Sequence, residues 1–308
     1  MSSSPEERAG VASVDCTGLQ ALVTGSTSGI GRAVALALGR LGADVFVHGR
    51  DASAGRAVVD SLAEMGVDAQ FVAADFADVD AVRDLAATVR ESTGGLDLLC
   101  NNAGGLFREG RLTDLGVEYT FHVNHLSPYL LTAELLDHLT EDARVVTTAS
   151  AAHQGASLDL DGVTSVADYS GVSAYSHSKL ANVLFASELA RRAEAAGLAI
   201  TSNSLHPGAI PGSGFSRFLP GPIPRLLKTL DVVPGVASVA DGAAEVLFLG
   251  VSPRTADVSG RYFANQQPKS PSDAARDAAA ANRLWRRSAD LLGIDEPLAE
   301  AVESPASD

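Results

Sequence analysis

The sequence predicts an α/β protein with a single domain, built on a doubly wound parallel sheet of about seven strands. Short continuous apolar runs alternate along the chain with longer segments that carry apolar residues at helical spacing. Continuous apolar strands are typical of a parallel sheet that helices cover on both faces. No internal repeat of fixed period and no interdomain linker interrupts this alternation, so one domain accounts for the pattern.

The expected strands, most of them short apolar runs, lie at residues 21–24, 44–47, 70–73, 96–100, 144–149 and 199–205. The expected helices alternate with them, at residues 30–41, 57–65, 79–89, 117–139 and 174–196. In the first helix, for example, the apolar residues recur three or four positions apart. We expect the domain to span residues 18–293, between a flexible leader at 1–17 and a disordered acidic tail at 294–308.

Composition excludes several classes of protein. Of the 308 residues, 46% are hydrophobic and 20% are charged, which is the balance of an ordinary folded enzyme. A net charge of -15 argues against nucleic acid as a partner, because phosphates would be repelled. The two cysteines are too few for a disulfide framework, and no apolar run is long enough for a signal peptide or a membrane span. We therefore expect a cytoplasmic protein.

Tyr175 and Lys179 form the first candidate catalytic pair. They open a helix that contains no proline or glycine until Gly197, so side chains four residues apart share one face. A lysine charge about 4 Å away could lower the pKa of the phenol by up to about three units, before the desolvation of the lysine is subtracted. Such a pair can transfer a proton to or from a hydroxyl or carbonyl oxygen. A chance pairing is the alternative, although Lys179 is the only lysine before residue 228.

A glycine-rich turn lies between the first strand and the first helix. Its sequence is Thr-Gly-Ser-Thr-Ser-Gly-Ile-Gly, at residues 24–31. Glycines allow a sharp turn and close approach of a ligand, and the amides of the helix N-terminus face the phosphates of that ligand. The cofactor-binding residues predicted here are Gly25, Ser26, Ser28, Gly29, Ile30 and Gly31.

Four motifs in this order resemble the short-chain dehydrogenase/reductase family. They are the turn at 24–31, Asn-Asn-Ala-Gly at 101–104, Ser150, and Tyr-x-x-x-Lys at 175–179. The stretches at 123–126, 175–185 and 283–293 are similar to the retinol-dehydrogenase branch in particular. The resemblance covers residues 18–293 and implies a Rossmann-like fold, a nicotinamide cofactor and hydride transfer to or from a carbonyl or alcohol.

The resemblance implies a role for each catalytic residue. Tyr175 would pass the proton to or from the substrate oxygen, and Lys179 would lower the pKa of Tyr175 and bind the nicotinamide ribose. Ser150 would hold the substrate oxygen, and Asn124 would anchor a water that extends the proton relay. Taken alone, Ser150 and Asn124 would be read as an ordinary strand-end hydroxyl and a helix amide.

The resemblance also assigns the remaining walls of the cofactor site. Asn102, Ala103 and Gly104 would lie beside the adenosine ribose, and Asp75 and Phe76 would border the adenine. Pro207 and Gly208 would flank the nicotinamide. The family often has a threonine after this turn, and here Ser213 could replace it.

The end of the second strand favours NADP(H), with NAD(H) as a possible alternative. An acidic residue at this position would bind the ribose hydroxyls of NAD, and this chain has Gly49 followed by Arg50. A guanidinium is suited to the 2′-phosphate of NADP. The alternative is a surface arginine that touches nothing.

The segment 209–233 is expected to form a lid over the substrate, a hydrophobic small molecule that is bulky and apolar and carries a carbonyl or alcohol group, with Phe215 and Phe218 as substrate contacts. A static loop that covers the sheet edge is the alternative. The seven histidines lack a third ligand at useful spacing, so no metal site is expected. Because helices 117–139 and 174–196 carry more apolar surface than one sheet face can cover, and relatives bury the same pair, we expect a homodimer or homotetramer.

The sequence therefore favours a carbonyl reductase that uses NADP(H). Two other functions remain open at this stage. One is a non-catalytic dinucleotide sensor on the same fold, which need not keep a proton donor. The other is epimerase or dehydratase chemistry on sugar nucleotides, which the same Tyr-Lys pair performs in related enzymes with a larger C-terminal domain.

Overall fold

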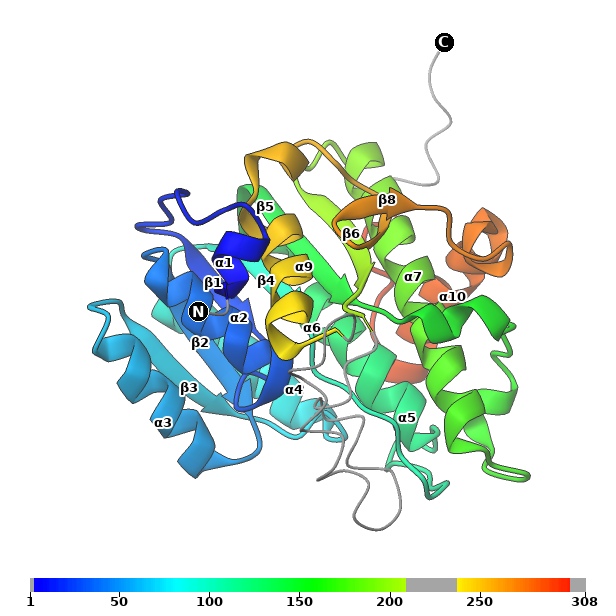
Figure 1. Cartoon of the computed structure of the whole chain (residues 1–308). Helices are drawn as coiled ribbons and strands as arrows, with labels where there is room; N and C mark the ends of the chain where they lie inside the picture. Colours follow the sequence, from blue (N-terminus) through cyan, green and yellow to red (C-terminus); the bar gives the residue numbers. More distant parts are fainter. Residues whose placement is uncertain (1–2, 209–236, 300–308) are drawn as a thin grey trace.

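The computed structural model describes residues 3–208 and 237–299. They form one α/β domain around an eight-stranded sheet with the order β3-β2-β1-β4-β5-β6-β7-β8 (Figure 1). All neighbouring strands are parallel except β7 and β8, so the doubly wound parallel sheet is confirmed, with one antiparallel strand added at its edge. The strands are β1 Gln20–Val23, β2 Asp44–Gly49, β3 Ala69–Ala73, β4 Leu96–Asn101, β5 Leu139–Thr148, β6 Thr201–His206, β7 Tyr262–Ala264 and β8 Gln267–Lys269.

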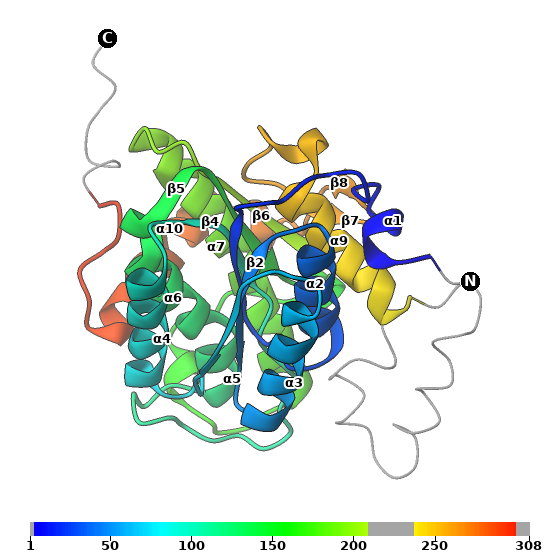
Figure 2. The same ribbon diagram turned by 90° about the vertical axis from the view of Figure 1, so that its left-hand side faces the viewer.

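Helices cover both faces of the sheet, which Figure 2 shows between its two layers. One layer holds α2 Gly29–Arg40, α3 Ala52–Ala63 and α9 Val239–Val251. The other holds α4 Val79–Ser92, α6 Ser127–Leu135, α7 Gly171–Ala195 and α10 Ala278–Leu292. Short helices complete the described part: α1 Pro5–Arg8, α5 Tyr119–Phe121, and turns of 3-10 helix at Leu136–His138, Ala151–Gly155, Gly162–Thr164, Pro253–Thr255 and Ala274–Arg276.

The strand order reverses between β1 and β4, since β2 and β3 lie to one side of β1 and β5 to β8 lie beyond β4. Ligands of open α/β sheets bind at such a switch point, outside the carboxyl ends of the strands. The topology therefore places the ends of β1, β4 and β5 around one crevice.

The long helix expected at residues 117–139 is interrupted. It consists of α5, a π-helical stretch at His122–Leu126, α6 and a final 3-10 turn, and β5 already begins at Leu139. Pro128 explains the interruption, because it has no N–H to donate to the carbonyl of Asn124 as a regular α-helix requires. The interruption lies at Asn124, one of the predicted site residues.

The N-terminal segment packs on the domain, whereas the sequence suggests a flexible leader. Val11 and Cys16 are buried. Glu6 forms a bidentate ion pair with Arg40 of α2, at 2.7 and 2.9 Å, and Arg8 pairs with Asp241 of α9. These contacts join three segments that are distant in the sequence.

The domain also continues beyond residue 293. Glu296 pairs with the fully buried Arg192 of α7 at 2.6 Å, and the indole N–H of Trp285 donates to the carbonyl of Pro297. Residues 294–299 are thus packed against α7 and α10, although a disordered tail is expected there. Among the described residues, no helix combines the length and apolar character needed to cross a membrane.

Candidate active site

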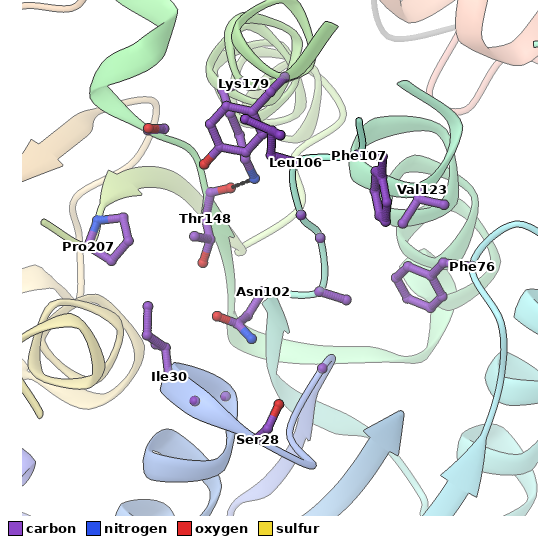
Figure 3. A pocket seen from close by; sticks show the side chains of 18 of the residues that line it. Ser28, Ile30, Phe76, Asn102, Leu106, Phe107, Val123, Thr148, Lys179 and Pro207 are labelled. Carbon is purple, nitrogen blue, oxygen red and sulfur yellow. Dashed lines mark hydrogen bonds between the residues drawn. The ribbon is translucent and has the colours of Figure 1, made fainter. Parts of the chain in front are cut away.

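A cavity of about 780 Å³ lies at the carboxyl ends of the strands (Figure 3). This volume is typical of a site for a cofactor and a small substrate. The cavity brings together four predicted parts of the site: the glycine-rich turn, the ends of β2 and β3, the loop after β4, and the catalytic helix α7. Its wall includes all the predicted residues within the described ranges except Ser26 and Asn124.

The glycine-rich turn is shaped for an anion. Gly25 and Gly29 have positive φ angles of 68° and 58°, which strain any residue with a side chain. A Cβ on Gly31 would lie 2.4 Å from the carbonyl oxygen of Gly25, so this close packing also requires glycine. The side chain of Ser28, the N-cap residue of α2, does not cap the helix, and the first turn contains no acidic residue. The positive dipole end of α2 faces the cavity, which Gly29, Ile30 and Gly31 line.

Ser26 does not line the cavity, although it was predicted to bind the cofactor. It is fully buried beneath the turn, where its Oγ accepts the N–H of His48 at 2.9 Å. Thr27 lines the cavity instead, and the sequence analysis missed it. The motif identifies the turn but not which of its side chains face outward.

His48 is a further residue that the sequence analysis missed. Its Nδ1 accepts the N–H of Gly25 at 3.2 Å, so Nε2 carries the proton and donates to the carbonyl of Ala74 at 3.2 Å. The ring stacks on Phe76 with the centroids 4.5 Å apart. Burial lowers the pKa of His48 to about 4, so the ring is neutral at pH 7. His48 therefore fixes the glycine-rich turn relative to Phe76 in the cavity wall.

Arg50 and Asp75 lie at the rim of the cavity. Their side chains are 63% and 47% exposed and are 3.5 Å apart, which makes a weak surface ion pair. The preceding Gly49 packs against Thr27, whose Cγ2 would lie only 2.5 Å from a Cβ at position 49. An acidic side chain at position 49 therefore has no room unless Thr27 moves.

The loop after β4 is held against the end of β1. Asn102 donates its side-chain N–H to the carbonyl of Thr24 at 2.9 Å, and the amides of Asn102 and Ala103 donate to the hydroxyl of Thr24. Gly104 follows with φ 154°, and a Cβ there would lie 2.7 Å from Oδ1 of Asn124. The loop thus brings its backbone close to the cavity, as its predicted place beside a ribose requires.

Asn124 lies behind this loop and not in the cavity wall. Its Oδ1 accepts the N–H of Gly105 at 2.9 Å, and its Nδ2 donates to the carbonyl of Gly105 and to Oγ of Ser178, each at 2.9 Å. Both amide protons of the side chain are therefore used within the protein. In this arrangement Asn124 ties the loop after β4 to helix α7.

Ser150, Tyr175 and Lys179 meet at one end of the cavity. Ser150 lies two residues beyond the end of β5 and caps the 3-10 turn Ala151–Gly155, where its Oγ accepts the N–H of Ala152 at 3.2 Å. Tyr175 is hydrogen-bonded to Ser150. Nζ of Lys179 donates to the carbonyl of Thr148 at 2.9 Å (Figure 3). The same atom lies 5.6 Å from the centre of the Tyr175 ring.

The pKa of Tyr175 differs from the sequence expectation. Burial raises the pKa of the phenol, and the hydrogen bond with Ser150 lowers it, with burial the larger effect. Burial also lowers the pKa of Lys179 to about 8. The groups that shift the pKa of Tyr175 do not include Lys179, whose Nζ donates to the carbonyl of Thr148.

The remaining predictions concern residues outside this cluster. His177 accepts the N–H of Asp159 and stacks on Phe121, so it takes no part in the cavity. No group of three His, Cys, Asp or Glu side chains within residues 3–208 and 237–299 could hold a metal. Phe215, Phe218, Ser213 and the proposed lid at 209–233 lie outside the described residues.

Comparison with known proteins gives consistent matches. The family model described as short chain dehydrogenase matches residues 20–217. Retinol dehydrogenase 13 of Homo sapiens is 36% identical over 295 residues, which cover 91% of this chain and 86% of that protein. A short chain dehydrogenase from Burkholderia cenocepacia J2315 in complex with NADP has a TM-score of 0.65 at 31% identity, covering 80% of this chain and 96% of its own. A landomycin C-6 ketoreductase with bound NADP and rabelomycin has a TM-score of 0.62 at 28% identity, covering 82% and 96%.

Proposed function

The chain belongs to the short-chain dehydrogenase/reductase family, with a likeness to its retinol dehydrogenases, and we propose that it is a carbonyl reductase that uses NADP(H). In this proposal it catalyses the reversible reduction of a bulky apolar carbonyl compound to the corresponding alcohol. The observation that carries the proposal is the convergence of Ser150, Tyr175 and Lys179 at one end of the cavity whose other end is the glycine-rich turn.

The residues present fit a nicotinamide dinucleotide. The turn at 25–31 and the N-terminus of α2 would hold its phosphates, the loop at 102–104 and Lys179 its ribose groups, and Pro207 and Gly208 its nicotinamide. The cofactor, when bound, supplies or accepts the hydride. The chain itself handles the proton.

Tyr175 would donate that proton to the substrate oxygen during reduction. The phenol is protonated near pH 7 and can donate, although the rise of its pKa on burial makes it a weaker acid than a free tyrosine. Ser150 would donate a second hydrogen bond to the same oxygen, because its Oγ already accepts from Ala152. The water relay at Asn124 is supported by Pro128, which leaves the Asn124 carbonyl without the N–H of a regular helix.

The preference for NADP(H) rests on the end of β2. Thr27 fills the space beside Gly49 that an acidic ribose ligand would need, and Arg50 can turn to a 2′-phosphate at little cost because its pairing with Asp75 is weak. Two structural relatives contain NADP, which supports the same preference. NAD(H) remains a possible cofactor.

The apolar character of the substrate is supported by Val172, which lines the cavity one turn before Tyr175 and is 66% exposed. Contact with an apolar ligand would remove the surface of this exposed valine from water, which favours binding of such a ligand. The landomycin ketoreductase, a structural relative, acts on a keto group, as its name states. Contacts from Phe215 and Phe218 stay predictions.

The test is oxidation of NADPH with a panel of hydrophobic ketones, aldehydes and quinones, set against small polar ketones and sugars. Tyr175→Phe should lower kcat at least about a hundredfold and leave NADPH affinity nearly unchanged. The matched control is Tyr129→Phe, because the buried hydroxyl of Tyr129 has no hydrogen-bond partner in the described part of the chain. Equal turnover of the two variants would remove Tyr175 from the mechanism.

The same assay separates the alternatives. NADPH binding without turnover on any substrate would favour a dinucleotide sensor, and conversion of sugar nucleotides without net oxidation of the cofactor would favour an epimerase. The described residues 266–299 include β8 and α10, which pack on the same domain, and this disfavours the second alternative.

A homodimer or homotetramer and a cytoplasmic location remain predictions. The prediction of an oligomer depends on exposed apolar surface of the helices, but the apolar surface of α7 is buried by other parts of the same chain. From Ser178 to Ala190 every residue of α7 is buried except the half-buried Ser187, and α10 packs against this helix. If the chain self-associates, we expect the interface to lie on another surface.

A further inference from the structure

His153 lies directly behind the catalytic serine. Its side chain is fully buried in the middle of the 3-10 turn Ala151–Gly155, which follows β5. Nδ1 lies 2.6 Å from the carbonyl oxygen of Ser150, and Nε2 accepts the backbone N–H of Ser272 at 3.2 Å. Because Nε2 is an acceptor, the ring proton is on Nδ1 and is donated to Ser150. Tyr262 packs edge-on against the ring with the centroids 4.8 Å apart.

These contacts fix Ser150 at two points. Its carbonyl oxygen accepts both the backbone N–H and the ring N–H of His153. Its Oγ accepts the N–H of Ala152, which belongs to the same turn. With one lone pair of Oγ occupied in this way, the hydroxyl proton is directed away from Ala152 and toward the cavity.

We propose that His153 is a positioning residue for the reaction, which holds the turn at 150–153 so that the Ser150 hydroxyl is presented as a donor to the substrate oxygen. This inference rests on the proposed carbonyl reductase function. His153 touches neither substrate nor cofactor in this proposal, and it does not line the cavity.

A neutral ring is essential to the arrangement, because a protonated Nε2 would face the N–H of Ser272 with a second N–H. Burial lowers the pKa of His153, and the bond to the Ser150 carbonyl opposes this effect. The fully buried ring is therefore neutral at pH 7. A purely structural role is the competing explanation, since the same ring ties the segment around Ser272 to the end of β5.

Two substitutions separate these roles, because each places a polar atom near the position of only one of the two ring nitrogens. His153→Asn places an amide N–H near Nδ1 and loses the acceptor for Ser272. His153→Gln reaches the position of Nε2 and loses the donor to Ser150. On our proposal, His153→Gln lowers kcat about ten- to a hundredfold with unchanged NADPH affinity, whereas His153→Asn stays within about threefold of the wild type.

The control is His177→Gln, which alters another histidine that accepts a backbone N–H but lies outside the site; kcat should change by less than about twofold. Thermal unfolding is measured for every variant. If the Gln variant does not fold, His153→Leu takes its place as the variant without a donor. Equal kcat losses for Asn and Gln, or a larger loss for Asn, would overturn the proposal and leave a structural role.

A second measurement does not depend on turnover. The hydrogen bond from Ser150 lowers the pKa of Tyr175, so displacement of Ser150 should raise the pKa of that phenol. Ultraviolet titration of tyrosinate, with the Tyr175→Phe background subtracted, should show a higher Tyr175 pKa in His153→Gln but not in His153→Asn. Absence of turnover in the wild type would refute the proposed function alone, and an unchanged titration would refute the role of His153.

Discussion

Arg50 provides a direct test of cofactor preference. Its side chain is 63% exposed and its partner Asp75 is 47% exposed, at a distance of 3.5 Å. Such a pair contributes roughly 0–1 kcal/mol, so little is lost when the guanidinium leaves it. A charge-assisted bidentate contact with a 2′-phosphate contributes about 1.5–3 kcal/mol. Arg50→Ala should therefore raise the Kd for NADPH about ten- to a hundredfold and leave the Kd for NADH nearly unchanged.

Fluorescence titration of the reduced cofactors measures both dissociation constants. Arg50→Lys keeps the charge but loses the planar fork, and it should recover only part of the NADPH affinity. Asp75→Asn is the matched control at the same rim: it removes the competing carboxylate, so NADPH should bind as tightly as to the wild type or more tightly. Equal affinity of the wild type for NADPH and NADH would refute the reasoning, as would equal losses for both cofactors in Arg50→Ala.

Three further predictions follow from the described residues. Lys179→Ala should weaken both kcat and cofactor affinity, measured by steady-state kinetics and titration, because two contacts are lost together. His48, His122 and His125 have pKa values lowered by burial to about 4, 4 and 3. Since the unfolded chain binds more protons, the free energy of unfolding by urea should fall between pH 7 and 5, by of the order of 1–2 kcal/mol per histidine; a flat profile would contradict this. Trp285→Ala should have a higher mass by light scattering than the wild type, because this residue anchors the packing of α10 over the apolar surface of α7; equal masses would contradict this.

The strands were predictable because their signal is local. β1, β2 and β4 are short and largely apolar, and such runs suffice to indicate a covered parallel sheet. β7 and β8 were missed, since each has three residues and shows no periodicity. The interruption of the helix was missed for another reason. The apolar pattern continues through Pro128, and such a pattern carries no information about the backbone N–H that proline lacks.

The structure of the N-terminal segment could not be predicted from its composition. Residues 3–17 are polar enough to suggest a flexible leader, yet a few buried apolar side chains and two ion pairs hold them on the domain. One of those pairs joins Arg8 to Asp241, 233 positions away. A contact at such separation leaves no local trace in the sequence.

Within the site, the motifs identified the reacting side chains but not the backbone groups that orient them. Lys179 was expected to act directly on the phenol of Tyr175, and it is instead bonded to the carbonyl of Thr148. His48 and His153 were missed because a lone histidine carries no motif, and only the fold brings them to the phosphate turn and to Ser150. Backbone partners of this kind depend on tertiary contacts.

Backbone carbonyls at and just after the end of β5 accept several of these hydrogen bonds. The carbonyl of Thr148 accepts from Lys179 at 2.9 Å and from Nδ2 of Asn182 at 3.2 Å, and the carbonyl of Ser150 accepts from His153. Strands β4 and β6 pair with β5 on both sides and hold its backbone in place. Because Asn182 also bonds to the Thr148 carbonyl, this buried oxygen keeps a partner if Lys179 turns toward a ribose. The lysine can then leave without the cost of about 1–3 kcal/mol that an unsatisfied buried carbonyl would impose.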